Sequence, residues 1–296
     1  MLRDERMAAY VNLAPKIERG DVYSEVTKLV KQKVAEDAKN PECPKRELAE
    51  KISPLITRKL LKQSVMTSVY GVTEYGVKGQ VKRWLMDPTA VNNFEFQKVF
   101  PESTEQYLKE CAIYLAKHTT NAIGQTNTPA WLSMLWLKDC AKKIAKHGYR
   151  VCWMTPLNLP CTQPYADATL QIPTSLQRVT VHTHEGVPNF MKQSSAFPPN
   201  FVHSLDSTHC LLTARAMHRH GMEFASIHDS FWAHACNVDK LNELLRDEFI
   251  HLHSRPLLQH LYQSFVTRYP ELDFAPPPQP SFFDLESVRK SEYFFS

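Results

Sequence analysis

The sequence predicts an α+β fold that is mostly helical and carries a small antiparallel β-hairpin. Apolar residues recur at helical spacing over long stretches, most clearly from Asp21 to Ala38 and from residue 129 to 147. In the segment FASIHDSFWAHA, from Phe224 to Ala235, apolar residues instead alternate with small or polar ones on both sides of His228 and Asp229. Such alternation with aromatic residues is typical of strands, so this segment is expected to form a hairpin with the polar pair in its turn.

Capping residues mark the ends of the first two expected helices. Asp21 is a favourable N-cap for a helix that runs to Ala38, and the NPECP segment that follows should end it. Ser53 and Pro54 form an N-cap followed by proline at the first helical position. A second helix is therefore expected to begin there and to run towards Gly71.

The rest of the chain is assigned by periodicity and by its prolines. Between Tyr149 and Pro199, many prolines and β-forming residues replace the helical pattern, which predicts strands and loops. The other expected elements are helices at 102–120, 129–147, 203–220 and 239–269, the last interrupted at Pro256, and a stiff proline-rich linker at 275–280.

The overall composition excludes several classes of protein. With 296 residues, of which 43% are hydrophobic and 22% charged, the chain resembles an ordinary globular protein with a substantial core. Its seven cysteines are scattered and include no C-x-x-C pair, which argues against a disulfide framework or a zinc knuckle and indicates a reducing compartment. No apolar run approaches the roughly 18 residues that a membrane span requires, so no membrane partner is expected.

Positive charge is concentrated between residues 51 and 86, although the net charge of the whole chain is only +4. Seven basic residues stand against one acid in this segment, and apolar residues such as Val65 and Val69 are interspersed among them. A solvated basic helix is a common explanation of such a pattern. The apolar residues instead favour a half-buried helix that directs its cations to a specific partner.

Five residues of this segment form a candidate site. Arg58, Lys62 and Met66 recur at every fourth position, which places them along one face of a helix. Tyr70 and Gly71 follow one turn later, where a glycine allows the helix to break and a ligand to approach the backbone closely. Arginine and lysine one turn apart suit a polyphosphate, since one is a planar fork and the other a point charge. The segment therefore predicts a phosphate-binding helix.

These motifs resemble those of the polymerase superfamily that includes single-subunit RNA polymerases and family A DNA polymerases. The R-x3-K-x7-Y-G spacing of the basic helix is similar to motif B, and the hairpin around Asp229 resembles motif C. Three further segments resemble RNA polymerases of phages and mitochondria: 1–15 the palm after motif A, 198–209 the segment that introduces motif C, and 283–296 the C-terminal tail. The chain is thus identified as a member of the single-subunit DNA-directed RNA polymerases, most similar to the mitochondrial enzymes.

The resemblance implies catalytic roles for three residues. Asp229 is similar to the motif C carboxylate that binds the catalytic Mg²⁺ ions, of which the complete enzyme holds two. Lys62, together with Arg58, matches the side chains that hold the incoming triphosphate. Tyr70 matches the tyrosine beside the ribose, which takes part in choosing ribonucleotides over deoxynucleotides.

The resemblance also implies nucleotide-binding roles for three other positions. Met66 occupies the place where family A DNA polymerases usually have phenylalanine. Gly71 is expected to let the template base and the end of the helix approach closely. His203 matches the histidine that contacts the minor-groove side of the new base pair and the ribose hydroxyl.

A division into fingers and palm follows from the same resemblance. The implied segments are a palm segment at 1–16, fingers at 17–202 with the motif B helix at about 54–71 and a specificity-loop region at about 153–196, and palm at 203–296 with the motif C hairpin at 224–235 and an aromatic tail. The implied partners are a DNA template, nascent RNA, NTPs and mitochondrial transcription accessory factors. The implied location is the mitochondrial matrix.

One element of the family pattern lies outside this sequence. Motif A supplies the second metal-binding carboxylate, and in the family it lies shortly before the position that matches Met1. The chain is therefore expected to be truncated before motif A and inactive on its own. Two alternatives stay open: a non-catalytic nucleic-acid-binding remnant, and a family A DNA polymerase, against which Met66 and Ser230 weigh because that family usually has phenylalanine and glutamate there.

Overall fold

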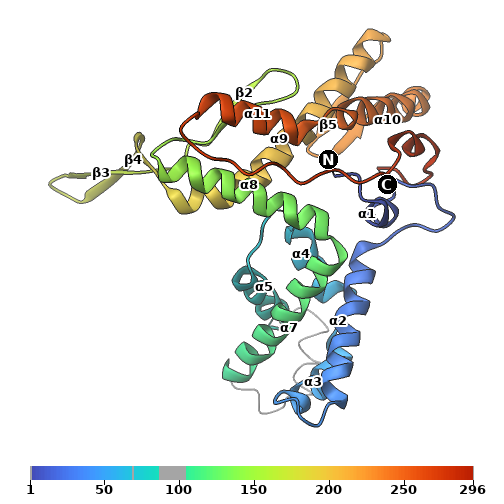
Figure 1. Cartoon of the computed structure of the whole chain (residues 1–296), viewed down its shortest axis with the longest axis vertical. Coiled ribbons are helices and arrows are strands. Elements are labelled where there is room, and N and C mark those ends of the chain that lie inside the picture. Colours follow the sequence, from blue (N-terminus) through green and yellow to red (C-terminus); the bar gives the residue numbers. More distant parts are fainter. Residues whose placement is uncertain (1, 69, 87–104, 296) are drawn as a thin grey trace. The chain divides into compact units, whose positions relative to one another are not determined.

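The computed structural model describes residues 2–68, 70–86 and 105–295, and it is mostly helical with small two-stranded antiparallel sheets (Figure 1). The predicted α+β class is therefore confirmed. The chain divides into two compact units, one formed by Arg6–Val11 and Lys16–Trp131 and the other by Met1–Glu5, Asn12–Pro15 and Leu132–Ser296. A boundary between fingers and palm near residue 202 stays a prediction, since it is a functional assignment.

The described part of the first unit contains helices and loops but no strand. Its elements are most of α1 (Glu5–Tyr10), α2 (Val22–Lys39), α3 (Arg46–Ile52), the 3-10 helix η1 (Ser53–Leu55), α4 (Arg58–Ser68), α5 (Glu74–Met86) and α7 (Glu105–Thr126). One buried cluster joins α2, α3, η1, α4, α5 and α7, with Val30 of α2, Leu61 of α4, Val81 of α5 and Leu115 of α7 fully buried. Burial of one apolar stripe from each helix explains why the opposite faces are charged.

The cap predicted for the first helix is present. The Oδ1 atom of Asp21 accepts hydrogen bonds from the backbone amides of Tyr23 and Ser24, at 3.0 and 3.4 Å. These bonds satisfy amide groups that have no partner inside the helix. The predicted end is also close, because α2 ends at Lys39, immediately before Asn40.

The second helix begins later than the sequence indicates. Ser53 and Pro54 start only the short η1, after which Ile56 is extended and fully buried. A new helix, α4, then begins at Arg58, and the Thr57 hydroxyl accepts a hydrogen bond from the Leu60 amide at 3.3 Å, as an N-cap residue does. Burial of Ile56 in the core thus outweighs the local signal for a continuous helix.

The second unit combines helices with three two-stranded sheets, β1–β2, β3–β4 and β5–β6. Its elements are most of α8 (Thr128–Lys146), β1 (Cys152–Met154), β2 (Pro160–Thr162), β3 (Ala166–Pro173), β4 (Arg178–Pro188), α9 (Phe190–Arg219), β5 (Ala225–Ile227), β6 (Ser230–Trp232), η2 (Ala235–Asn237), α10 (Val238–Ser254), α11 (Leu257–Arg268) and η3 (Leu285–Lys290). The interruption predicted at Pro256 is confirmed, since it separates α10 from α11.

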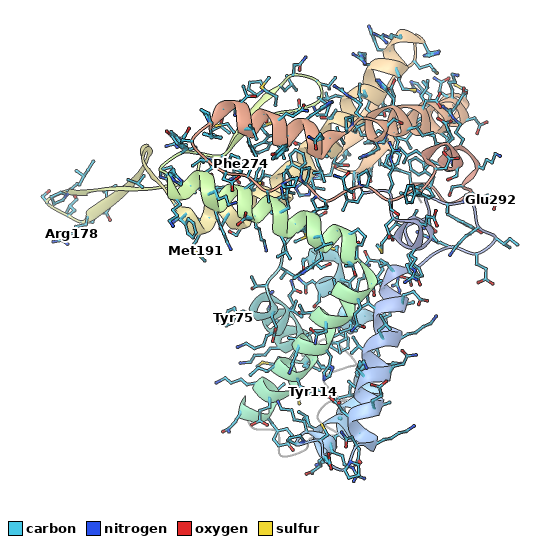
Figure 2. The ribbon with its side chains drawn as sticks, in the orientation of Figure 1. Tyr75, Tyr114, Arg178, Met191, Phe274 and Glu292 are labelled. Atoms are coloured by element: carbon cyan, nitrogen blue, oxygen red, sulfur yellow. The ribbon has the colours of Figure 1, made fainter. Side chains whose placement is uncertain are left out.

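Aromatic side chains form the core of the second unit. Phe197 of α9 is fully buried, with its ring centroid 5.4 Å from that of Trp153 and 5.9 Å from that of Phe265. Phe274, labelled in Figure 2, packs on Phe265 at 5.7 Å. The proline-rich segment after it is anchored by Trp136, whose indole N–H donates to the Ala275 carbonyl at 2.8 Å. This core joins α8, α9, α11 and strand β1.

The long helix α9 begins before its predicted start at His203. The Asn189 side chain caps it by accepting a hydrogen bond from the Lys192 amide at 2.8 Å, and the helix continues through Pro198 and Pro199 to Arg219. Prolines inside a helix remove amide donors and normally favour an end. Here Phe197 and its neighbours are buried in the core, so tertiary packing holds the helix across the two prolines.

The strands β3 and β4 project from the rest of their unit as a two-stranded ribbon (Figure 1). Its tip is solvent-exposed, and Leu176 there is 95% exposed. The ribbon lies inside the segment that the resemblance assigns to the specificity loop. In the described parts of the chain, no helix is both long and apolar enough to cross a membrane.

Candidate functional site

The exposed side of α4 carries the side chains that the motif B spacing predicted. Arg58, Lys62 and Met66 are all exposed, whereas Leu61 and Val65 on the other side are buried. The structure therefore brings the three residues onto one accessible face, as expected for positions four residues apart in a helix. A half-buried basic helix is present.

The end of α4 has a geometry that depends on Gly71. Gly71 has a φ of 78°, its amide donates to the Ser68 carbonyl at 3.0 Å, and the next amide, of Val72, donates to the Thr67 carbonyl at 3.2 Å. This pair of hydrogen bonds is the Schellman arrangement, which favours glycine because only glycine adopts positive φ without a steric penalty. It leaves Tyr70 39% exposed at the end of the helix.

The first cation of this face, Arg58, has two neighbours at the start of α2. Its Nε donates to Oδ2 of Asp21 at 2.6 Å, and its guanidinium lies 5.1 Å from the ring centroid of Tyr23. Burial would raise the pKa of Asp21, but the hydrogen bonds from Arg58 and Ser24 outweigh it and lower that pKa. The same hydrogen bond raises the pKa of Arg58. The pair is thus ionised at neutral pH.

The neighbouring helix α5 is fixed to α4 and adds further cations. The Gln80 side-chain amide donates to the Thr67 hydroxyl at 3.0 Å. On α5, the Lys78 ammonium lies 4.5 Å from the ring centroid of Tyr75, and Arg83 is exposed. Tyr75 is labelled in Figure 2. The two helices together therefore present a basic surface with an aromatic ring in it, a combination that suits nucleic acid.

The predicted hairpin is present, with a two-residue turn. Strand β5 pairs antiparallel with β6, and Ile227 is the partner of Ser230, so that His228 and Asp229 alone form the turn. His228 has a φ of 54°, the positive value that two-residue hairpin turns require at their first position. Histidine is one of the few residue types that adopts this region. The turn leaves Asp229 exposed at the tip.

Aromatic packing holds this hairpin to its unit. Phe231 of β6 is half-buried, with ring centroids 5.4 Å from Phe224 and 5.1 Å from Phe295 of the C-terminal tail, whereas its neighbour Trp232 is 59% exposed. The same cluster covers His209 of α9, which bonds the Leu245 carbonyl at 2.9 Å and whose pKa is lowered by burial. The strand that follows the Asp229 turn is therefore anchored to its unit through Phe231.

His203, the remaining predicted contact, lies on the exposed side of α9 beside a cavity. The cavity has a volume of about 440 Å³, and Trp153, Asn200, Ser204 and Leu211 also line it. One wall is fixed by a hydrogen bond of 3.0 Å from the Trp153 indole to the Ser204 hydroxyl. The structure thus places His203 at a concave surface.

A buried amide network, which sequence reasoning missed, joins the base of the β3–β4 ribbon to α9. Gln163 and Gln193 are both buried; the Gln163 side chain donates to the Gln193 side-chain oxygen, and the Gln193 side chain donates to the Tyr165 carbonyl, at 2.9 and 2.8 Å. Asn200 donates to the Gln163 side chain at 3.1 Å. Buried amides are costly without such partners, so this network fixes the first turns of α9.

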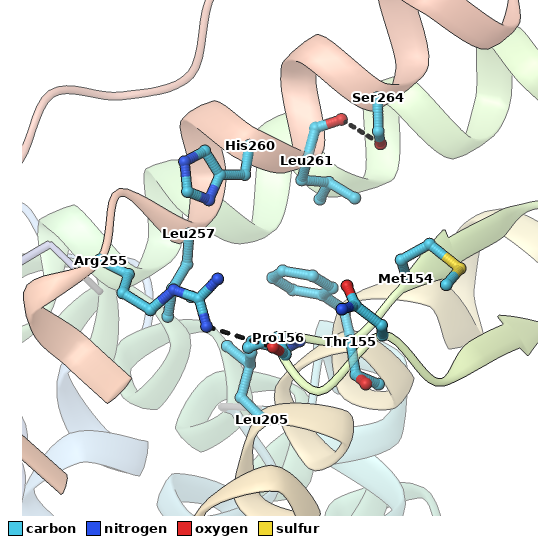
Figure 3. Close-up of a pocket in the computed structure, with 11 residues that line it drawn as sticks. Met154, Thr155, Pro156, Leu205, Arg255, Leu257, His260, Leu261 and Ser264 are labelled. Carbon is cyan, nitrogen blue, oxygen red and sulfur yellow. Dashed lines mark hydrogen bonds between the residues drawn. The ribbon is translucent and has the colours of Figure 1, made fainter. Parts of the chain in front are cut away.

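Another cavity, of about 160 Å³, lies between the β1–β2 loop, α9 and α11 (Figure 3). Phe201 and Leu205 are among its apolar lining residues, and His260 also lines it. Arg255 crosses towards the loop and donates to the Pro156 carbonyl at 3.1 Å. None of the residues that line it was predicted as a site residue.

The residues that could hold a metal ion are few. Within the described ranges, no group of three or more histidine, cysteine or acidic side chains is close enough together to form a metal centre. The Asp229 carboxylate at the hairpin tip is nonetheless suited to Mg²⁺, which takes one or two carboxylates and completes its shell with water and substrate phosphates. Asp229 and α4 belong to different units, so the geometry of each motif is described separately.

Comparison with known proteins gives a consistent result. Residues 1–273 match the family described as DNA-dependent RNA polymerase. The chain is 42% identical over 297 residues to DNA-directed RNA polymerase 2B, chloroplastic/mitochondrial, of Nicotiana tabacum, an alignment that covers 99% of this chain and 28% of the relative. It is 41% identical over 299 residues to the mitochondrial DNA-directed RNA polymerase 1B of the same plant, again over 28% of the relative. Against its DNA-directed RNA polymerase 2A, identity is 42% over 86% of the relative.

Proposed function

The chain belongs to the family of DNA-dependent RNA polymerases, in their single-subunit form, and on that premise we propose that it supplies the nucleotide-binding helix and the catalytic hairpin of a DNA-directed RNA polymerase. The carrying observation is the exposed face of α4, where Arg58, Lys62 and Met66 lie together and a Schellman end follows. Because the chain spans 28% of the length of the tobacco 2B polymerase, the activity of the whole enzyme is part of this proposal.

The proposed reaction is template-directed nucleotidyl transfer. The 3′-hydroxyl of RNA attacks the α-phosphate of an NTP, and pyrophosphate leaves. Arg58 and Lys62 bind the triphosphate and offset the negative charge that develops on the leaving group. Tyr70 borders the ribose and His203 contacts the new base pair, so these two residues orient the nucleotide and check its sugar.

Asp229 is the proposed magnesium ligand of this chain. Two bound Mg²⁺ ions would activate the attacking hydroxyl and neutralise the leaving pyrophosphate. The two-residue turn keeps the carboxylate exposed, and β6 is packed through Phe231, which suits a ligand that also meets substrate phosphates. One carboxylate is a weak magnesium site, so turnover requires a further acidic ligand beside it. We therefore expect the 296-residue chain alone to bind nucleic acid without extending RNA.

A specific observation supports one alternative function. The exposed cations of α4 and α5 are enough for nucleic-acid binding without chemistry, which would make the chain a non-catalytic remnant. The family match argues against the other alternative, a family A DNA polymerase.

Binding and extension can be measured on the purified chain with a primed template. We expect the binding constant to fall steeply with salt: for duplex DNA, its logarithm should change with the logarithm of the salt concentration by a slope of about −0.9 per phosphate contact. We expect no incorporation of NTPs. Absence of salt-dependent binding would contradict the nucleic-acid role. Magnesium-dependent extension that disappears in Asp229→Ala would instead show that the chain is a complete catalyst.

A mitochondrial location is also proposed. The similar proteins of Nicotiana tabacum are named as mitochondrial, chloroplastic, or both. A polymerase of this type would meet its DNA template, nascent RNA and NTPs in the mitochondrial matrix, along with transcription accessory factors.

A further inference from the structure

The start of α2 makes an unexpected contact with the candidate triphosphate site. Asp21 and Tyr23 both touch Arg58, although 37 residues separate Asp21 from Arg58 in the chain. All three residues belong to the same unit. The contact therefore concerns how the guanidinium of Arg58 is held before any nucleotide arrives.

The Asp21 carboxylate is itself firmly fixed. One oxygen accepts the two backbone amides that cap α2, of Tyr23 and Ser24, and the other accepts the Ser24 hydroxyl at 2.7 Å and Nε of Arg58 at 2.6 Å. A carboxylate with so many partners has little rotational freedom. Its hydrogen bond to Nε thus fixes the plane of the guanidinium, and the Tyr23 ring supports it by a cation–π contact.

The remaining edge of the guanidinium is the part that matters for a ligand. Among the described residues, Nη1 and Nη2 of Arg58 form no hydrogen bond or ion pair, and Arg58 is 47% exposed. The Nη edge of a guanidinium carries two parallel N–H groups, the geometry that binds phosphate oxygens in pairs. Lys62 lies one turn further along the same exposed face.

We propose that Asp21 and Tyr23 are positioning residues, which hold Arg58 with its Nη edge free to receive the triphosphate of the incoming nucleotide. This inference rests on the proposed role of Arg58 in nucleotide binding. The opposite effect is a latch, in which the negative charge of Asp21 competes with phosphate. Contact through Nε favours positioning, because a competitor would occupy the Nη edge itself.

Positioning and a latch predict opposite changes in phosphate affinity when Asp21 is replaced. The purified chain is titrated with inorganic tripolyphosphate for the wild type and for Asp21→Ser, which retains a good N-cap but cannot reach Arg58. Positioning predicts about two- to fivefold weaker binding, as expected for the loss of one exposed ion pair. Unchanged or tighter binding in Asp21→Ser would overturn the proposal, and tighter binding would show a latch.

Two further variants separate positioning from folding and from the proposed function. In an Arg58→Lys background, Asp21→Ser should cause no further loss, since lysine has no Nε for Asp21 to orient; a full additional loss would contradict the proposal. Asp21→Asn keeps one acceptor oxygen for the cap but places a donor NH2 group where Oδ2 accepts from Nε, so it should bind as weakly as Asp21→Ser. If Arg58→Lys itself weakens binding while Asp21→Ser does not, this inference fails alone. If the wild-type chain does not bind tripolyphosphate, the proposed role of Arg58 fails with it.

Discussion

Replacing Asp229 with asparagine should abolish ribonucleotide addition while the hairpin stays folded. The substitution keeps the shape of the side chain but removes the charge that a magnesium ion needs. Since a bound metal ion stabilises the transition state by several kcal/mol, we expect the rate to fall by about 10³-fold or more. The measurement is template-directed extension by tobacco polymerase 2B in which this chain replaces the matching segment, 28% of that polymerase.

The control for this experiment is Glu223→Gln, an exposed acid just before the hairpin. It removes the same charge from the same surface but not from the turn, so the chimera should keep its activity. If Asp229→Asn retained more than a tenth of the activity of the unmodified chimera, Asp229 would not be a metal ligand. A loss of equal size in Glu223→Gln would assign the effect to the charge of the surface instead.

The second large effect is expected at Lys62. Lys62→Gln should raise the KM of the chimera for NTPs by about 10- to 100-fold, because a hydrogen bond between two charged groups is worth about 1.5–3 kcal/mol. The affinity for template should change little. Steady-state kinetics at varied NTP concentration give the KM, and filter binding gives the template affinity.

Lys59→Gln is the matched control for Lys62. Lys59 is an exposed lysine on the same helix, but it is not on the line of Arg58, Lys62 and Met66. Its replacement should leave the KM within about twofold, as for an ordinary surface charge. Equal increases in KM for the two variants would show that α4 acts only through its net charge.

Local signals predicted several elements well. The Asp21 cap, the break at Pro256 and the alternation around Asp229 each involve residues close in the sequence, and the structure contains all three features. The starts of α4 and α9 were predicted wrongly for a common reason. Burial of Ile56 in one case, and of Phe197 together with the Gln163–Gln193 network in the other, depends on partners that periodicity cannot show.

In the candidate site, too, local features were predicted and contacts between distant residues were not. Spacing alone placed Arg58, Lys62 and Met66 on one face of a helix, and the exposed face of α4 agrees. The contact of Asp21 with Arg58 could not be predicted from the sequence. The role of Asp21 as a helix cap and the position of Arg58 on a helix each follow from local sequence, and neither indicates that the two residues meet. The support of the Asp229 hairpin by Phe295 was equally hidden, since the resemblance identified the tail but not what it packs against.

The most direct test of Asp229 as the metal ligand of an RNA polymerase is to map the metal itself. When Fe²⁺ replaces Mg²⁺ in the chimera with template and ATP, and hydrogen peroxide and ascorbate are added, the hydroxyl radicals that Fe²⁺ forms from peroxide should cut the chain within residues 224–235. The cut should require ATP, disappear in Asp229→Asn and persist in Glu223→Gln. Cleavage elsewhere only, or a cut in the hairpin that survives Asp229→Asn, would contradict the assignment.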